Sequence, residues 1–84
     1  MYQVLINRKA EKELSKINKT DIPRVFRAIK DLGINPRPTG SKKLVGEDNA
    51  WRIRVGNYRI LYEVEDIVKI VTVYKVGHRK DVYD

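Results

Sequence analysis

The stretch Trp51-Arg-Ile-Arg-Val-Gly-Asn-Tyr-Arg-Ile-Leu-Tyr62 predicts two β-strands joined by a tight turn, and this hairpin decides the fold. The dipeptide Gly56-Asn57 is typical of a two-residue hairpin turn, because such turns require positive φ angles that these residue types tolerate. A two-residue turn also fixes the register of the strands, so that Arg54 lies directly opposite Arg59.

The two faces of this hairpin differ sharply in chemistry, since side chains alternate across a strand. One face is apolar and carries Trp51, Ile53, Val55, Tyr58, Ile60 and Tyr62. The other face carries Arg52, Arg54 and Arg59. A single arginine on a sheet is commonly a solvated residue whose stem covers the strand. Three arginines on one small face, two of them directly opposed, repel one another and indicate a site for an anion such as a nucleic-acid phosphate.

Composition supports one small basic domain spanning residues 1–84. The chain has 18 Lys and Arg against 11 Asp and Glu, a formal net charge of +7, which favours a polyanionic partner. It has no cysteine, which excludes disulfides, zinc fingers and thiol catalysis and fits a cytoplasmic location. No secretion signal and no membrane-spanning run is found, so we expect no membrane association.

The residues before the hairpin predict a strand followed by two helices. Residues 2–6 have strand character, and Asn7 is a candidate cap for an amphipathic helix over residues 8–17. A second helix begins at Thr20 or Asp21 and ends at Gly33. Its expected buried stripe consists of Ile22, Val25, Phe26, Ile29 and Leu32. Residues 34–43 then form a surface loop, because they contain Asn35, Pro36, Pro38 and Gly40.

After the hairpin, residues 68–76 are rich in β-branched residues and predict an interior strand. The resulting fold class is α+β. An N-terminal strand and an antiparallel helix pair precede a three-stranded antiparallel meander, and the helices pack on the apolar face of a four-stranded sheet. The opposite face of the sheet is left for a ligand.

The C-terminal residues from Gly77 to Asp84 are polar and aromatic, and they carry candidate catalytic groups. Arg79 and Tyr83 are four residues apart and share a face if this segment forms a helical turn. If the segment folds back across the sheet, His78, Arg79 and Tyr83 join the three hairpin arginines around one phosphate. The sequence has no Gly-rich phosphate loop and no metal-binding motif, so we expect no metal and no other cofactor. RNA cleavage by attack of the 2′-hydroxyl on its own phosphate is the reaction that such a site suits.

Over nearly its whole length the chain resembles the RelE/ParE superfamily of toxins, and specifically the RelE-type mRNA interferases. The resemblance rests on four segments, which are Lys43-Leu-Val-Gly46, Trp51-Arg-Ile-Arg54, Tyr58-Arg-Ile-Leu-Tyr62 and Val76-Gly-His-Arg-Lys-Asp-Val-Tyr83. It implies a toxin of a type II toxin-antitoxin system that cleaves mRNA in the ribosomal A site. It also implies silencing by an acidic RelB-like antitoxin.

The resemblance also implies roles for individual residues. Arg59 and Arg79 would orient the phosphate and stabilise its charge, and Tyr83 would stack on a base or transfer a proton. Family members have two basic residues at the positions of Arg52 and Arg54; in well-known members these are lysines, and one of those lysines is a proposed proton carrier. The identity of the general base is therefore left open here, with His78 and Tyr83 as the better candidates, and His78 is favoured because its ordinary pKa is about 6.5. We assign as candidate RNA-binding residues Lys42, Lys43, Lys75 and Lys80.

Two other functions remain open from the sequence. One is a ParE-like module that inhibits DNA gyrase by binding, and the other is a non-catalytic protein that binds RNA or the ribosome. The Arg79 and Tyr83 pair favours the nuclease, because a protein that only binds has no evident need for a tyrosine one turn from an arginine.

Overall fold

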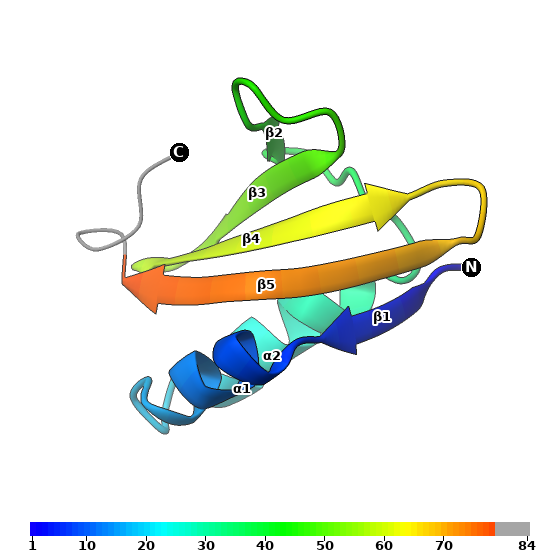
Figure 1. Cartoon of the computed structure of the whole chain (residues 1–84). Helices are drawn as coiled ribbons and strands as arrows, with labels where there is room; N and C mark the ends of the chain where they lie inside the picture. The colour runs from blue at the N-terminus through cyan, green and yellow to red at the C-terminus, as the bar shows by residue number, and fades with distance from the viewer. Residues whose placement is uncertain (79–84) are drawn as a thin grey trace.

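The computed structural model describes residues 1–78 as a five-stranded sheet with two helices packed on one face (Figure 1). The elements follow in the order β1 (Gln3–Ile6), α1 (Arg8–Ser15), α2 (Ile22–Asp31), β2 (Lys42–Lys43), β3 (Ala50–Val55), β4 (Tyr58–Glu65) and β5 (Ile70–His78). The α+β class and the order of one strand, two helices and then the meander are as the sequence predicts.

The strands lie in the order β1-β5-β4-β3-β2, so β5 is an interior strand, as expected. Strands β3, β4 and β5 form the antiparallel meander, and β1 pairs in parallel with β5 at one edge. The expectation of four strands is wrong by one, because Lys42–Lys43 pairs with β3 at the other edge. A turn at Gly46, with φ of +82°, returns the chain to β3 and makes this pairing possible.

The hairpin has the register that the sequence predicts. Arg54 pairs with Arg59, and Ile53 pairs with Ile60. Gly56 has φ of +59°, in the left-handed region that the turn requires. The register is therefore a direct consequence of the length and composition of the turn.

The pairing of β4 with β5 contains an irregularity that the sequence does not reveal. Leu61 pairs with Lys75, but the next residue, Tyr62, pairs with Val73, so Tyr74 is the extra residue of a bulge. Beyond the bulge, Val76 is again buried in the core. The bulge therefore lets both halves of β5 contribute valines to the same hydrophobic layer.

Both helices begin close to their expected positions. The side chain of Asn7 accepts a hydrogen bond from the Ala10 amide at 2.9 Å and caps α1. This helix ends at Ser15, two residues before the expected Ile17, because the amides of the next residues bond three positions back instead of four. Asp21 is the N-cap residue of α2, and it makes no side-chain capping bond.

The core lies between the helices and the sheet. It contains buried residues of α1, α2, β3, β4 and β5, including the fully buried Tyr62. Val25, Ile29 and Leu32 of the expected helical stripe are buried, but Phe26 is 51% exposed. Phe26 follows Val25 by 100° around the helix, which turns its ring away from the sheet. Its expected place in the core is therefore a wrong prediction.

Candidate functional site

The face of the sheet opposite the helices carries the paired hairpin arginines. Arg54 on β3 and Arg59 on β4 are direct cross-strand partners. Arg54 is exposed, and Arg59 is partly buried. Gly77 of β5 continues this row beside Arg59 and contributes no side chain to it. Two guanidinium groups therefore share one end of the outer face, as the sequence predicts.

Arg52 lies on the same face, but its side chain is not exposed as that of Arg54 is. It is only 6% exposed, and it is the one charged residue among the buried residues of the described chain, 1–78. Arg52 lies between Lys42 of β2 and Leu61 of β4, so its long stem lies over the interior of the sheet. Arg52 therefore lies on the expected face, but the expectation that it projects outward with Arg54 and Arg59 is wrong, because it is buried.

The candidate RNA-binding lysines divide between the two faces. Lys42 is exposed and lies opposite Arg52 on the outer face, whereas Lys43 pairs with Trp51 and so shares the helix-side face. Lys75 lies in the same cross-strand row as Arg52. The outer face therefore groups Lys42 and Lys75 with the arginines.

His78 occupies a different place from the one expected. It pairs with Tyr58, and the two rings make an edge contact with centroids 5.9 Å apart. Tyr58 packs against the hydrophobic core on the helix side, so His78 shares that side. The expectation that His78 joins the arginines on the outer face is wrong, because alternation along β5 turns it to the other face. Arg79, Lys80 and Tyr83 lie outside the described residues.

Two polar contacts from the helical layer hold the hairpin that carries the arginines. The Tyr58 hydroxyl donates to the Asp21 carboxylate at 3.1 Å. The same hydroxyl accepts from the Asn18 amide at 3.4 Å, so the loop between the helices is tied to the base of the turn. The hairpin end is therefore braced from the side opposite to its cationic face.

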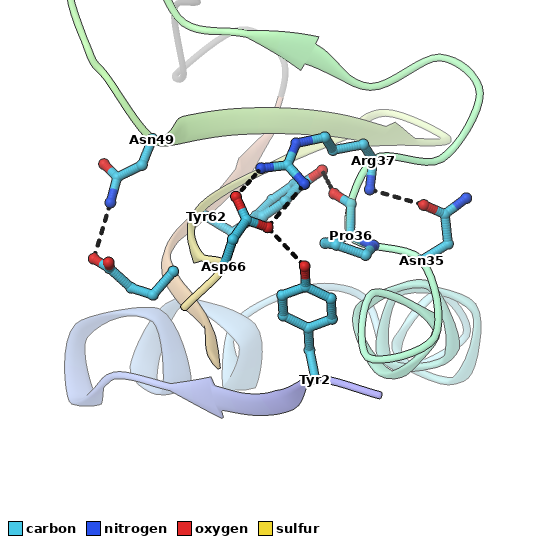
Figure 2. Close-up of polar contacts among 8 residues, drawn as sticks. Tyr2, Asn35, Pro36, Arg37, Asn49, Tyr62 and Asp66 are labelled. Atoms are coloured by element: carbon cyan, nitrogen blue, oxygen red, sulfur yellow. Dashed lines mark hydrogen bonds and ion pairs between the residues drawn. The ribbon is translucent and has the colours of Figure 1, made fainter. Parts of the chain in front are cut away.

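At the other end of the sheet, Arg37 and Asp66 form a clamp that sequence analysis missed (Figure 2). Arg37 donates to both carboxylate oxygens of Asp66, at 3.1 and 2.8 Å, and the Tyr2 hydroxyl donates to the same carboxylate at 2.6 Å. The hydrogen bonds from Arg37, and to a smaller extent the one from Tyr2, lower the pKa of Asp66 to about 2. In turn, the hydrogen bond to the Asp66 carboxylate raises the pKa of Arg37. The Arg37 guanidinium also lies 5.2 Å from the centre of the Trp51 ring. No local pattern relates residues so far apart in the sequence.

The loop that carries Arg37 has a second, buried attachment. The Tyr62 hydroxyl donates to the Pro36 carbonyl at 2.7 Å in the core (Figure 2). Burial raises the pKa of Tyr62 to about 12. These contacts fix the loop that leads into β2 and hence the position of Lys42.

Residues 1–78 contain no group of three or more His, Asp or Glu side chains placed to hold a metal ion. None of the helices of this part of the chain is long and apolar enough to cross a membrane.

Comparison with known protein families identifies the class of protein to which this fold and its basic outer face belong. The family described as the ParE toxin of type II toxin-antitoxin systems (parDE) matches residues 4–83, and the chain belongs to this family. Proteins described as RelE toxins are among its relatives. The putative toxin RelE1 of Methanocaldococcus jannaschii is 27% identical over 98% of this chain and 94% of its own length.

Solved structures of RelE toxins share the whole fold. RelE in the RelE-RelB complex of Pyrococcus horikoshii superposes with a TM-score of 0.83 at 27% identity, covering 96% of this chain and 98% of that one. RelE in the RelB-RelE complex of Methanococcus jannaschii superposes with a TM-score of 0.77 at 30% identity, covering 95% of each chain. Membership of the toxin family and the RelE fold are thus established, as the sequence resemblance implies.

Proposed function

We propose that this toxin is an endoribonuclease that cleaves mRNA in the ribosomal A site and so inhibits translation in the cytoplasm. The observation that carries the proposal is the pair Arg54 and Arg59, directly opposed on the open face of a RelE fold. Two like charges directly opposed across a strand pair repel each other, and an anion bound between them would relieve that repulsion. A phosphodiester is the anion that their planar, bidentate geometry suits.

The proposed reaction is attack of an RNA 2′-hydroxyl on the adjacent phosphorus, without a metal ion. The 2′-oxygen forms a bond to phosphorus as the bond to the 5′-oxygen of the next nucleotide breaks, and a proton passes from the first oxygen to the second. Negative charge grows on the phosphate oxygens in the transition state, so fixed cations beside them lower the barrier. Arg54 and Arg59 supply this charge. Arg52 is buried, so it would add to the positive electrostatic potential of this face without contacting the phosphate.

Proton transfer requires other residues, because arginine stays protonated. The candidates are His78 and Tyr83, with Arg79 as a further phosphate ligand. His78 is the last residue of β5. It lies on the helix side, so it would have to reach the phosphate around the end of the strand. The position of His78 therefore makes it a weaker candidate for the general base than the sequence indicates. Tyr83 becomes the stronger candidate.

The proposed partners follow from charge and from the family. The chain carries a net charge of +7, and RelE relatives have been solved in complexes with RelB. We therefore propose a cognate RelB-like antitoxin of acidic character as its inhibitor. The proposed RNA-binding residues on the outer face are Lys42 and Lys75, which would contact phosphates on either side of the cleaved bond.

The decisive experiment is induction of the chain in cells, followed by primer extension on translated mRNA. We expect growth arrest and new 5′ ends within codons. Arg59→Ala, Arg79→Ala and Tyr83→Phe should each relieve the arrest while the far-ultraviolet circular dichroism stays unchanged. Arg27→Ala is the matched control, because Arg27 is an exposed arginine on α2 in the helical layer, and it should remain toxic.

The chemistry is tested separately on the cleaved RNA. A 2′,3′-cyclic phosphate on the upstream fragment, and loss of cleavage when the scissile nucleotide is 2′-deoxy, are the expected results. A 5′-phosphate on the downstream fragment would instead indicate attack by water and would contradict the proposed mechanism.

Inhibition of DNA gyrase is the second candidate, because the matching family carries the ParE description. Uncut mRNA together with blocked supercoiling by purified gyrase would favour it over RNA cleavage. Ribosome binding without either effect would favour a non-catalytic role.

A further inference from the structure

Strand β5 extends beyond its neighbour β1, so β1 does not pair with the last residues of β5. The parallel pairing with β1 covers only Ile70 to Val73, and the Asn7 amide makes the last contact by bonding the Val73 carbonyl at 3.0 Å. The chain then turns directly into α1. Within residues 1–78, the second half of β5 therefore has a strand partner on one side alone, which is β4.

A side chain of α1 bonds to β5 on the side that β1 leaves uncovered. The Oε1 atom of Glu13 accepts a hydrogen bond from the Val76 amide at 2.9 Å in a partly buried position. A carboxylate that accepts from a backbone amide makes a charge-assisted bond, which is stronger than a neutral one. The bond joins residues 63 positions apart and ties α1 to the C-terminal half of β5.

The position of Glu13 is fixed in turn by the start of its helix. The Asn7 side chain caps α1, while the Asn7 backbone amide is bonded to β5. Because one residue joins both elements, α1 begins at a set distance from the strand. Glu13 lies near the end of α1, where it reaches β5 three residues past Val73. The position of this contact is therefore set by the fold itself, through the start of α1 and its attachment to β5.

The segment that Glu13 holds is the one that leads into the proposed site. The residue after Val76 is Gly77, which lies beside Arg59 in the outer-face row, and His78 follows it. Glu13, Val76, Gly77 and His78 also line one shallow hollow of about 380 Å³ on this edge. A shift of the strand end would therefore move Gly77 relative to Arg59.

We propose that Glu13 is a positioning residue for RNA cleavage, which holds the end of β5 in register through the Val76 amide. This inference rests on the proposed nuclease function. Reaction rates depend steeply on the placement of catalytic groups, so a displacement of about 1 Å can cost roughly a hundredfold in rate. The sheet, in contrast, keeps all its other pairings when one edge contact is lost, so only the strand end should loosen.

The test compares three variants of the full chain. Glu13→Ala removes the acceptor, Glu13→Gln keeps an acceptor oxygen without the charge, and Glu11→Ala removes an exposed carboxylate from the same helix as a control. Two quantities are measured for each variant. One is the exchange rate of the Val76 amide proton by NMR, and the other is the rate of mRNA cleavage on programmed ribosomes at several toxin concentrations.

We expect Glu13→Ala to speed exchange of the Val76 amide at least tenfold and to lower the maximal cleavage rate roughly tenfold or more. The toxin concentration that gives half the maximal rate should change less than twofold. Glu13→Gln should restore most of both quantities, and Glu11→Ala should match the wild type. Urea unfolding should stay cooperative in all variants.

An unchanged maximal rate in Glu13→Ala, alongside faster Val76 exchange, would overturn the positioning role while leaving the nuclease function intact. Slow Val76 exchange in Glu13→Ala would overturn the anchor itself. If the wild type cleaves no RNA, the proposed nuclease function fails, and the positioning role for cleavage fails with it. The exchange data would then show by themselves whether Glu13 anchors β5.

Discussion

The buried hydroxyl of Tyr62 offers the sharpest test of how the fold is held together. Tyr62 is fully buried, and its hydroxyl donates to the Pro36 carbonyl at 2.7 Å. Tyr62→Phe keeps the ring in the core and leaves that carbonyl without its donor. Loss of one partner of a buried hydrogen bond should lower the free energy of unfolding by about 1–2 kcal/mol. For a domain of this size, this corresponds to a fall in Tm of roughly 4–16 °C.

The same hydroxyl predicts a dependence on alkaline pH. Burial raises the pKa of Tyr62 to about 12, whereas a tyrosine in the unfolded chain titrates near 10. Above pH 10 the unfolded chain releases this proton while the folded chain retains it, so the wild type loses stability as pH rises. By pH 11 this loss should reach about 1.4 kcal/mol. Tyr62→Phe has no proton to lose, so the stability gap between the two proteins should nearly close.

Urea unfolding followed by the fluorescence of Trp51, the single tryptophan, measures both effects at pH 8 and pH 11. Tyr74→Phe is the control at pH 8, because Tyr74 is only partly buried and lies outside the hydrophobic core. Its cost should stay within about 0.5 kcal/mol. A gap between wild type and Tyr62→Phe that is the same at both pH values would refute the reasoning. So would a cost at pH 8 no larger than that of Tyr74→Phe.

Three further predictions concern contacts at the two ends of the sheet. The pKa of Asp66 is lowered to about 2, first by the Arg37 hydrogen bonds. The stability that this pair contributes should therefore be lost as pH falls from 4 to 2. Over this range the urea midpoint of the wild type should fall more than that of Asp66→Asn. Tyr58→Phe removes the bond to Asp21 and should lower the free energy of urea unfolding by about 0.5–1.5 kcal/mol. Gly56→Val forces a branched residue to φ of +59° and should lower the free energy of unfolding by about 1–2 kcal/mol, seen as a lower Tm in a thermal melt.

The outer face combines exposed and buried cations in a way that bears on function. Arg54 is exposed and Arg59 is partly buried, while Arg52 is buried. Substitution of Arg52 would therefore change stability as well as the proposed activity, whereas Arg54 is the cleaner probe of the proposed RNA contact. The clamp of Arg37 and Asp66 lies at the opposite end of the sheet and serves the loop before β2.

The sequence by itself determined the hairpin, its register and the separation of its two faces. The physical reason is local, since a two-residue turn containing Gly56 sets the pairing and strand alternation then assigns each side chain to a face. The capping of α1 by Asn7 and the α+β order follow from equally local patterns. Each of these predictions is confirmed.

Tertiary structure alone decided the features that depend on contacts between distant residues. The bulge at Tyr74, the burial of Arg52, the face of His78 and the bond from Glu13 to Val76 each arise where separate elements meet. No periodicity within one segment encodes such a meeting, because it depends on how far each strand extends past its neighbour. The sequence thus determined which side chains share a face of the hairpin, and packing decided which of them a ligand can reach.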